Sequence, residues 1–163
     1  MKKILLSLLL ALSIIPFDSY SKSKEPPFQC ELEVAEIGKA GTVVAKLCVY
    51  SKNKKINDET IIKNAILGIC FNGVYPNESR RMRGIRPLIE GEYENYKEYF
   101  DNFFSTHDYY NYVRIGLDGY AEQGDLIKVK KQYKIGRLVV INLSELRKRL
   151  ENDNVINSLT NGF

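Results

Sequence analysis

The sequence predicts an α+β domain in which helices pack on one face of a mostly antiparallel sheet. Three observations favour this class. Residues 28–51 contain two strand-like segments joined by a short turn. Two later segments, residues 58–71 and 92–105, place apolar side chains at helical spacing. The remaining strand-like segments follow one another through short connections, which suits antiparallel pairing.

The first two strands are expected to form a hairpin. Residues 28–34 alternate strictly between apolar and polar, which is typical of a half-buried strand. Residues 38–41 (GKAG) make the turn, and the β-branched run 42–51 makes the second strand. If Gly38 lies opposite Gly41, the numbers of paired residues add to 79.

This register decides the positions of two cysteines. It places Glu33 opposite Lys46, a favourable pair, and keeps the apolar side chains of both strands on one face. Cys30 then faces the core, whereas Cys48 faces the other side. We therefore expect no disulfide between Cys30 and Cys48.

The first helix begins where Asn57 or Asp58 can cap it, and it ends at Asn72-Gly73. Its inward stripe is expected to contain Ile61, Ile62, Ala65, Ile66, Ile69 and Cys70. Residues 74–87 are rich in proline, glycine and arginine, so they are expected to be irregular. The second helix, residues 92–105, should turn aromatic side chains inward: Tyr93, Tyr96, Phe100 and Phe103, with Tyr99 and Phe104 beside them.

The last third of the chain is expected to form three strands and a helix. The strands are residues 109–117, 126–135 and 137–142, and turn signals lie at 118–119 and 123–124. Ser144 should cap the helix, with a break near residues 152–154. Its inward residues would be Leu146, Leu150, Val155, Ile156 and Leu159.

The first 21 residues are typical of a secretory signal peptide. Met1-Lys2-Lys3 precedes a run of 14 uncharged residues, and Ser19 and Ser21 fit a cleavage site. That run is shorter than the roughly 20 residues of a membrane span. We expect cleavage after Ser21, a flexible arm over residues 22–27 and one domain over 28–163, in the periplasm or outside the cell.

Composition excludes several classes of function. Removal of residues 1–21 takes Lys2, Lys3 and Asp18 from 24 basic and 20 acidic residues, so the mature chain carries a net charge of +3. This charge is mild and evenly mixed, which argues against nucleic acid as a partner. No cofactor motif is present, and with one histidine no His-rich metal site can form.

His107, the one histidine of the chain, is the candidate for general acid–base catalysis. It could act as a general base beside Cys70, or in a Ser-His-Asp set with Asp108. No nucleophile motif supports either arrangement, so a small envelope-acting hydrolase is the alternative rather than the main hypothesis. Cys70 has a second possible role, because a Cys30–Cys70 disulfide could form where the first helix covers the sheet; buried free thiols are the alternative.

Two segments are candidate binding surfaces. Residues 80–86 hold four arginines, Arg80, Arg81, Arg83 and Arg86, whose guanidinium groups could bind phosphate or carboxylate. The second candidate is Tyr109-Tyr110, because exposed tyrosines can anchor a partner. Both segments have an ordinary alternative: a solvated loop for the arginines, and core packing for the tyrosines.

Three segments carry a resemblance to a known group: NAILGICFNGV, YFDNFFSTHDYYNYVRIG and YKIGRLVVINLSELRKRLENDNVINSLTNGF. They resemble uncharacterised secreted proteins of the Bacteroides group. The resemblance implies an exported domain and assigns no activity or site residue. The resulting hypothesis is a non-enzymatic binding module whose partner is an envelope protein or an anionic envelope component.

Overall fold

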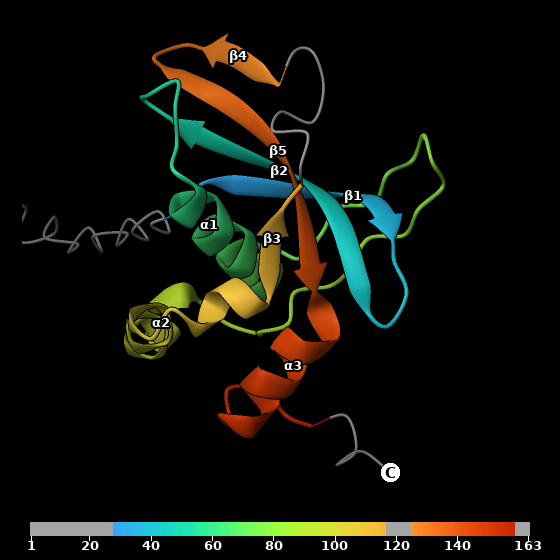
Figure 1. The fold of residues 1–163 in the computed structure, drawn as a ribbon, viewed down its shortest axis with the longest axis vertical. Helices are drawn as coiled ribbons and strands as arrows, with labels where there is room; N and C mark the ends of the chain where they lie inside the picture. Colours follow the sequence, from blue (N-terminus) through green and yellow to red (C-terminus); the bar gives the residue numbers. More distant parts are fainter. Residues whose placement is uncertain (1–27, 117–124, 159–163) are drawn as a thin grey trace, which may run out of the picture.

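The fold was examined in a computed structural model, which describes residues 28–116 and 125–158 (Figure 1). The expected signal peptide and arm, and the turn signals at 118–119 and 123–124, lie outside these residues. The elements follow in the order β1 Cys30–Ile37, β2 Thr42–Ser51, α1 Asp58–Phe71, α2 Lys97–Ser105, β3 Val113–Ile115, β4 Leu126–Val129, β5 Gln132–Asn142 and α3 Leu143–Asn152. Short 3₁₀ helices, η1 Tyr93–Tyr96 and η2 Asp108–Asn111, flank α2.

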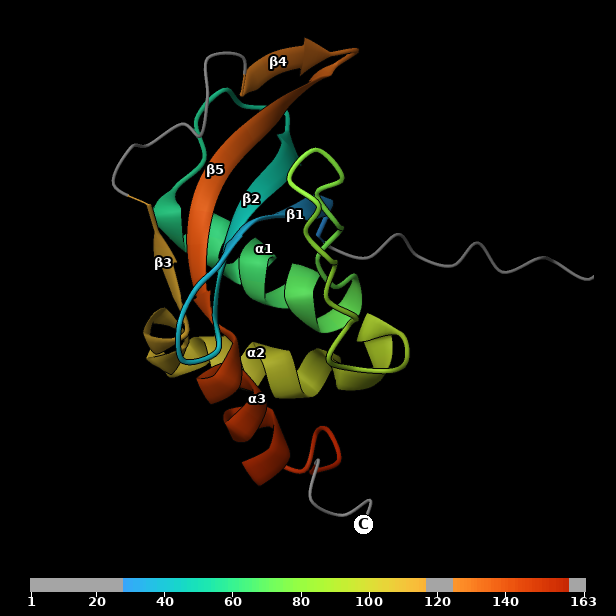
Figure 2. The same ribbon diagram turned by 90° about the vertical axis from the view of Figure 1, so that its right-hand side faces the viewer.

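The predicted fold class is confirmed. Five strands form one sheet in the order β1-β2-β5-β3, with β4 also paired to β5, and all of these pairs are antiparallel. β5 is the central strand of the sheet and pairs with three others. β2 follows it along one edge, while β4 and β3 share the other edge, β4 at the start of β5 and β3 at its end. Three helices pack against this sheet (Figures 1 and 2).

The predicted hairpin register is confirmed over most of its length. Cys30 pairs with Val49 and Val34 with Ala45, as the sum of 79 requires. Beyond Val34 the register shifts by one, so that Glu36 lies opposite Val44. Ala35 is the extra residue of this bulge, which adds local twist to the edge strand.

One face of the sheet is buried under α1. The stripe predicted for this helix is buried, and Asn57 caps it by accepting a hydrogen bond from the Thr60 N–H at 3.0 Å. The helix ends as predicted: Gly73 has φ +75° and donates its N–H to the Gly68 carbonyl at 2.9 Å. The core opposite α1 consists of alternate strand residues: Cys30, Leu32, Val34, Val43, Ala45, Leu47, Val49, Val113, Val139 and Ile141.

The segment predicted as the second helix covers one side of α1 with aromatic rings. It is 3₁₀ over Tyr93–Tyr96 and α-helical only from Lys97. Phe100 and Phe103 are buried as predicted. Phe100 lies at the centre of the cluster, with its ring centroid 5.1–6.3 Å from those of Phe71, Tyr93, Tyr99, Phe103 and Phe104.

Two strand predictions are wrong. Residues 108–111 form η2 instead of the start of a strand, so β3 has only three residues. The segment 126–135 is not one strand either, because a two-residue turn at Lys130-Lys131 divides it into β4 and the start of β5. β5 then runs without interruption through Gly136, where the sequence suggested a boundary.

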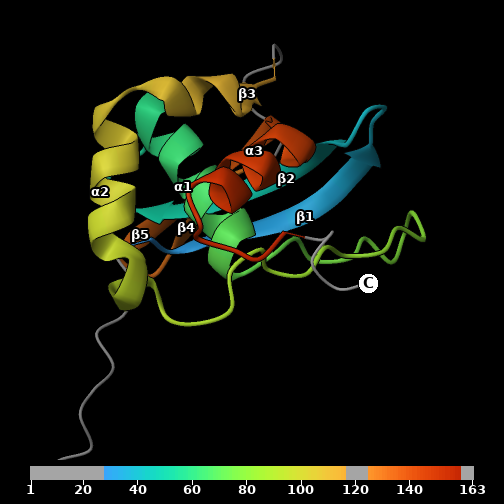
Figure 3. The same ribbon diagram turned by 90° about the horizontal axis from the view of Figure 1, so that it is seen from below.

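α3 continues directly from β5 at the lower end of the molecule (Figures 1 and 3). Its cap is Asn142 rather than Ser144, because the Asn142 side chain accepts from the Glu145 N–H. The helix ends at Asn152, where a break was predicted, but it does not resume at Val155 and Ile156 as expected, and Asn154 takes a positive φ of 58°. Leu146 and Leu150 are buried and Val155 and Ile156 half-buried against the core, whereas Leu159 lies outside the described residues.

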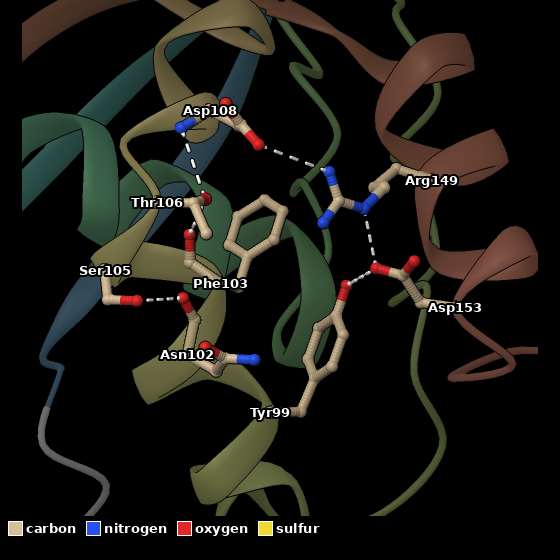
Figure 4. A network of polar contacts seen from close by, with 8 residues as sticks. All are labelled: Tyr99, Asn102, Phe103, Ser105, Thr106, Asp108, Arg149 and Asp153. Atoms are coloured by element: carbon tan, nitrogen blue, oxygen red, sulfur yellow. Dashed lines mark hydrogen bonds and ion pairs between the residues drawn. The ribbon is translucent and has the colours of Figure 1, made fainter.

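Polar contacts join α3 to α2 (Figure 4). The Asp153 carboxylate accepts hydrogen bonds from Arg149 Nε at 2.6 Å and from the Tyr99 hydroxyl at 2.7 Å. The Arg149 guanidinium also lies 5.5 Å from the centroid of the Phe103 ring and 3.8 Å from Asp108. These contacts attach the end of α3 to Tyr99 and Phe103 of α2.

Candidate functional site

Residues 74–85, expected to be irregular, form a small hairpin beside β1 (Figure 1). Val74 and Ile85 exchange two backbone hydrogen bonds of 2.8 Å, and Asn77 and Met82 exchange two of 3.2 and 2.9 Å. We call residues 74–86 the arginine hairpin. Its backbone conformation is therefore defined by pairing, in contrast to that of a solvated loop.

The arginine hairpin is attached to the edge of β1. The Val34 N–H donates to the Tyr75 carbonyl at 3.0 Å, and the Tyr75 N–H donates to the Leu32 carbonyl at 2.7 Å. Arg80 adds a third link, because its guanidinium donates to the carbonyl of Ala35, the bulge residue, at 3.0 Å. One of the four predicted binding arginines thus has a structural contact.

The other three arginines make no such side-chain link to β1 within the described residues. Arg81, Arg83 and Arg86 are exposed, and none forms an ion pair within the described part of the chain. Met82 and Ile85 pack against the core between them. The hairpin therefore presents three exposed guanidinium groups on a backbone that is hydrogen-bonded to β1.

The two tyrosines predicted as a binding surface have different environments. Tyr109 is completely buried, and burial raises the pKa of its hydroxyl above the usual value. It packs edge-on against Phe104 and stacks on Tyr110 with 4.6 Å between ring centroids. Tyr109 is therefore a core residue and cannot form a contact surface. Tyr110 remains 42% exposed.

The structure does not bring His107 and Cys70 into one site. Cys70 is completely buried on α1, and this burial raises the pKa of its thiol, so a thiolate is disfavoured. His107 is exposed, and its Nδ1 lies 3.1 Å from the Ser105 carbonyl of the same loop. Its neighbour Asp108 faces Arg149 instead.

All three cysteines are free, so the proposed Cys30–Cys70 disulfide is not present. Cys30 faces α1 at Gly68, and its thiol donates to the Asn64 carbonyl at 3.2 Å. Cys70 lies two residues beyond Gly68, about 200° further around the helix, and so faces elsewhere. The absence of a Cys30–Cys48 bond, in contrast, agrees with the predicted register.

A second candidate site lies on the face of the sheet opposite α1, and sequence reasoning did not identify it. Two hollows of about 460 and 440 Å³ adjoin there and share Glu33 and Lys46. The arginine hairpin contributes Tyr75, Pro76, Asn77 and Arg80 to their lining. The first hollow is completed by Glu31, Leu32, Cys48, Asp125, Ile127, Lys134 and Gly136.

Ion pairs set the electrostatics of the first hollow. Lys134 lies 2.8 Å from the Glu31 carboxylate and holds the pKa of Glu31 below its usual value. Lys46 lies 2.6 Å from Asp125. Burial raises the pKa of the Cys48 thiol despite these two lysines, so Cys48 stays protonated at neutral pH.

The sequence contained a partial signal for this face. The polar positions of residues 30–34 and the opposing Lys46 indicated a wet face. No sequence pattern near Asp125 indicated that it belongs to this face, because it follows a turn signal. It reaches the sheet through the pairing of β4 with β5.

Two features are absent from the described residues. Residues 28–116 and 125–158 contain no group of three or more His, Cys, Asp or Glu side chains that could hold a metal ion. No helix within these ranges has both the length and the apolar character needed to cross a bilayer.

Comparisons with protein-family models, with curated proteins and with solved structures gave no match to this chain.

Proposed function

We propose that this protein is an exported binding module that contacts an anionic component of the cell envelope through the arginine hairpin. The observation that carries the proposal is a set of three exposed guanidinium groups, without an ion pair among the described residues, on a hairpin anchored to β1. Export rests on the signal-peptide pattern of residues 1–21.

The chemistry of arginine supports an anionic partner. A guanidinium group donates two parallel hydrogen bonds to phosphate or carboxylate, which a lysine ammonium group cannot do. Arg81, Arg83 and Arg86 lie within six residues, so their charges repel one another until an anion is bound. The anchored backbone reduces the conformational entropy that binding would otherwise cost.

Two kinds of anion could supply this chemistry, and defined probes separate them. Phosphatidylglycerol vesicles present phosphate groups, and immobilised polyglutamate presents carboxylates. We expect Arg81→Ala with Arg83→Ala to weaken binding to at least one probe by about fivefold or more at low salt. The loss should shrink at high salt, because screening already removes most of the attraction.

The matched control removes two lysines from an exposed loop, Lys52→Ala with Lys55→Ala, and so changes the net charge equally. This control should retain binding. Equal losses in both double variants would mean that net charge alone drives adsorption. If the arginine variant bound both probes as tightly as the wild type, the hairpin would be an ordinary solvated surface and not a binding site.

A further inference from the structure

We propose that the hollow beside Asp125 binds a small organic cation through its ammonium group, independently of the exposed arginines of the arginine hairpin. The Asp125 side chain is 8% exposed, and Oδ1 lies 2.6 Å from Lys46 Nζ. Its second oxygen, Oδ2, is buried and has no hydrogen-bond partner within residues 28–116 and 125–158. An unsatisfied buried carboxylate oxygen is costly, so a donor bound there would remove a penalty.

The backbone is shaped around this carboxylate. Gly136 lies beneath it and donates its N–H to the Asp125 carbonyl at 2.6 Å. A Cβ at position 136 would lie 2.6 Å from the carboxylate carbon, which is closer than atoms approach. Glycine in the middle of a long strand weakens the strand, and here its absent side chain leaves the space that Asp125 occupies.

The charges that line the hollow favour a cation. Three carboxylates, those of Glu31, Glu33 and Asp125, face two ammonium groups, those of Lys46 and Lys134. Glu31 already accepts from Lys134 and from the Tyr50 hydroxyl. The described lining residues therefore carry one negative charge in excess. Glu33 is exposed to solvent, so the buried acceptor that has no partner among the described residues is Oδ2 of Asp125.

The remaining lining limits the ligand to a small molecule with an apolar part. Tyr75 and Ile127 are 54% and 52% exposed at the hollow, so aliphatic groups could pack between them. A volume of about 460 Å³ is within the range of small-molecule sites. A divalent metal ion is disfavoured, because such ions require several oxygen ligands and Lys46 lies beside the carboxylate.

The test uses the full-length chain and two probes of similar shape, n-butylammonium chloride and n-butanol, with sodium chloride to match ionic strength. Binding is followed by the backbone amide resonances of Cys48 and Gly136. We expect saturable shifts with butylammonium and none with butanol. Equal shifts with both probes, or no saturable shift with either, would overturn the proposal.

Two variants should change the affinity in opposite directions. Asp125→Asn removes the charged acceptor and should weaken butylammonium binding about tenfold. Lys46→Met retains the Asp125 acceptor and removes the ammonium group that competes for it, so binding should tighten by about threefold or more. The second variant keeps the test valid if Asp125→Asn fails to fold.

Lys63→Met is the matched control. Lys63 also pairs with a carboxylate, that of Glu59, at 2.6 Å, but it lies on α1 and outside this hollow. Its loss should leave the affinity unchanged. Unchanged affinity in Asp125→Asn, or in Lys46→Met, would contradict a site at Asp125.

Discussion

At the scale of single residues, Asp153 has the clearest electrostatic role. Its side chain is 28% exposed, and burial alone would raise its pKa. The hydrogen bonds from Arg149 and Tyr99 outweigh that effect and lower the pKa of Asp153 below its usual value. The ionised form is therefore more stable in the folded state than in the unfolded chain.

This shift gives a pH-dependent prediction for Asp153→Asn. Because the folded-state pKa is lowered, the contribution of Asp153 is complete above its unfolded-state pKa and is lost as the pH falls through the folded-state value. We expect the variant to lose about 1 kcal/mol of unfolding free energy at neutral pH. Urea unfolding between pH 7 and pH 3 should show this difference shrinking toward zero in acid.

Asp101→Asn provides the control for that series. Asp101 pairs with Lys97 one turn away on α2, and both side chains are more than half exposed. Its replacement should leave the urea midpoint unchanged at every pH. A deficit in Asp153→Asn that stays constant down to pH 3 would show that packing, not ionisation, stabilises this corner.

Single residues also explain where the sequence analysis failed. A helical stripe places Cys70 on the buried side of α1, but only the packing angle of the helix shows that Gly68 faces Cys30. Tyr109 presented a similar difficulty. Its neighbours in sequence are polar or exposed, and η2 turns its ring against Phe104, a contact that depends on three-dimensional packing.

At the scale of elements, the β4–β5 turn is the feature that the sequence concealed. Hairpin turns of two residues usually contain glycine or asparagine, because φ is positive there. Here Lys130 takes φ +54° and is followed by Lys131, so no turn residue marked the position. The alternating apolar residues on both sides of this turn therefore predicted one continuous strand.

The strained turn predicts that Lys130→Gly will stabilise the protein. Glycine adopts positive φ without the steric cost that lysine incurs, although it also gains entropy in the unfolded chain. We expect a net gain of about 0.5–1 kcal/mol in urea unfolding.

The control is Lys131→Gly at the adjacent turn position, which has no positive φ. It should be neutral or destabilising. A loss of stability in Lys130→Gly, or the same gain in both variants, would contradict the assignment of strain to Lys130.

The arginine hairpin shows the opposite limitation at this scale. The proline and glycine residues of 74–87 correctly indicated a connection without a helix between α1 and the aromatic residues 93–104. It could not indicate that Tyr75 would pair with β1, because that pairing joins residues more than 40 positions apart. Local sequence signals locate a connection well, and they carry little information about what the connection touches.

At the scale of the whole molecule, the described residues share one hydrophobic core, which runs from Phe28 to Ile156. We therefore expect a single cooperative unfolding transition, with coincident midpoints by far-ultraviolet circular dichroism and by tyrosine fluorescence. Phe100→Ala should cost about 3–5 kcal/mol, because Phe100 is completely buried among five other rings.

Different midpoints by circular dichroism and by tyrosine fluorescence would show that the cluster of rings around Phe100 unfolds independently of the sheet. Tyr110→Ala is the comparison, because Tyr110 is partly exposed and stacks on a single ring. It should cost much less than Phe100→Ala.

The sequence predicted the architecture better than the sites, for a physical reason. Periodicity reports burial, and burial decides the layers of an α+β fold. The hollow at Asp125 depends instead on which strands become neighbours, and β4 reaches that position only by pairing with β5.

The order of strands also determines when the sheet can be completed. Thr42 in β2 pairs with Asn142 in β5, one hundred residues later. Contacts of such long range form slowly, because a large loop must close before they contribute stability. A chain emerging from the ribosome therefore lacks the central strand of its sheet until residues 132–142 have been synthesised. That delay favours an unfolded nascent chain, which is the form that the proposed export would require.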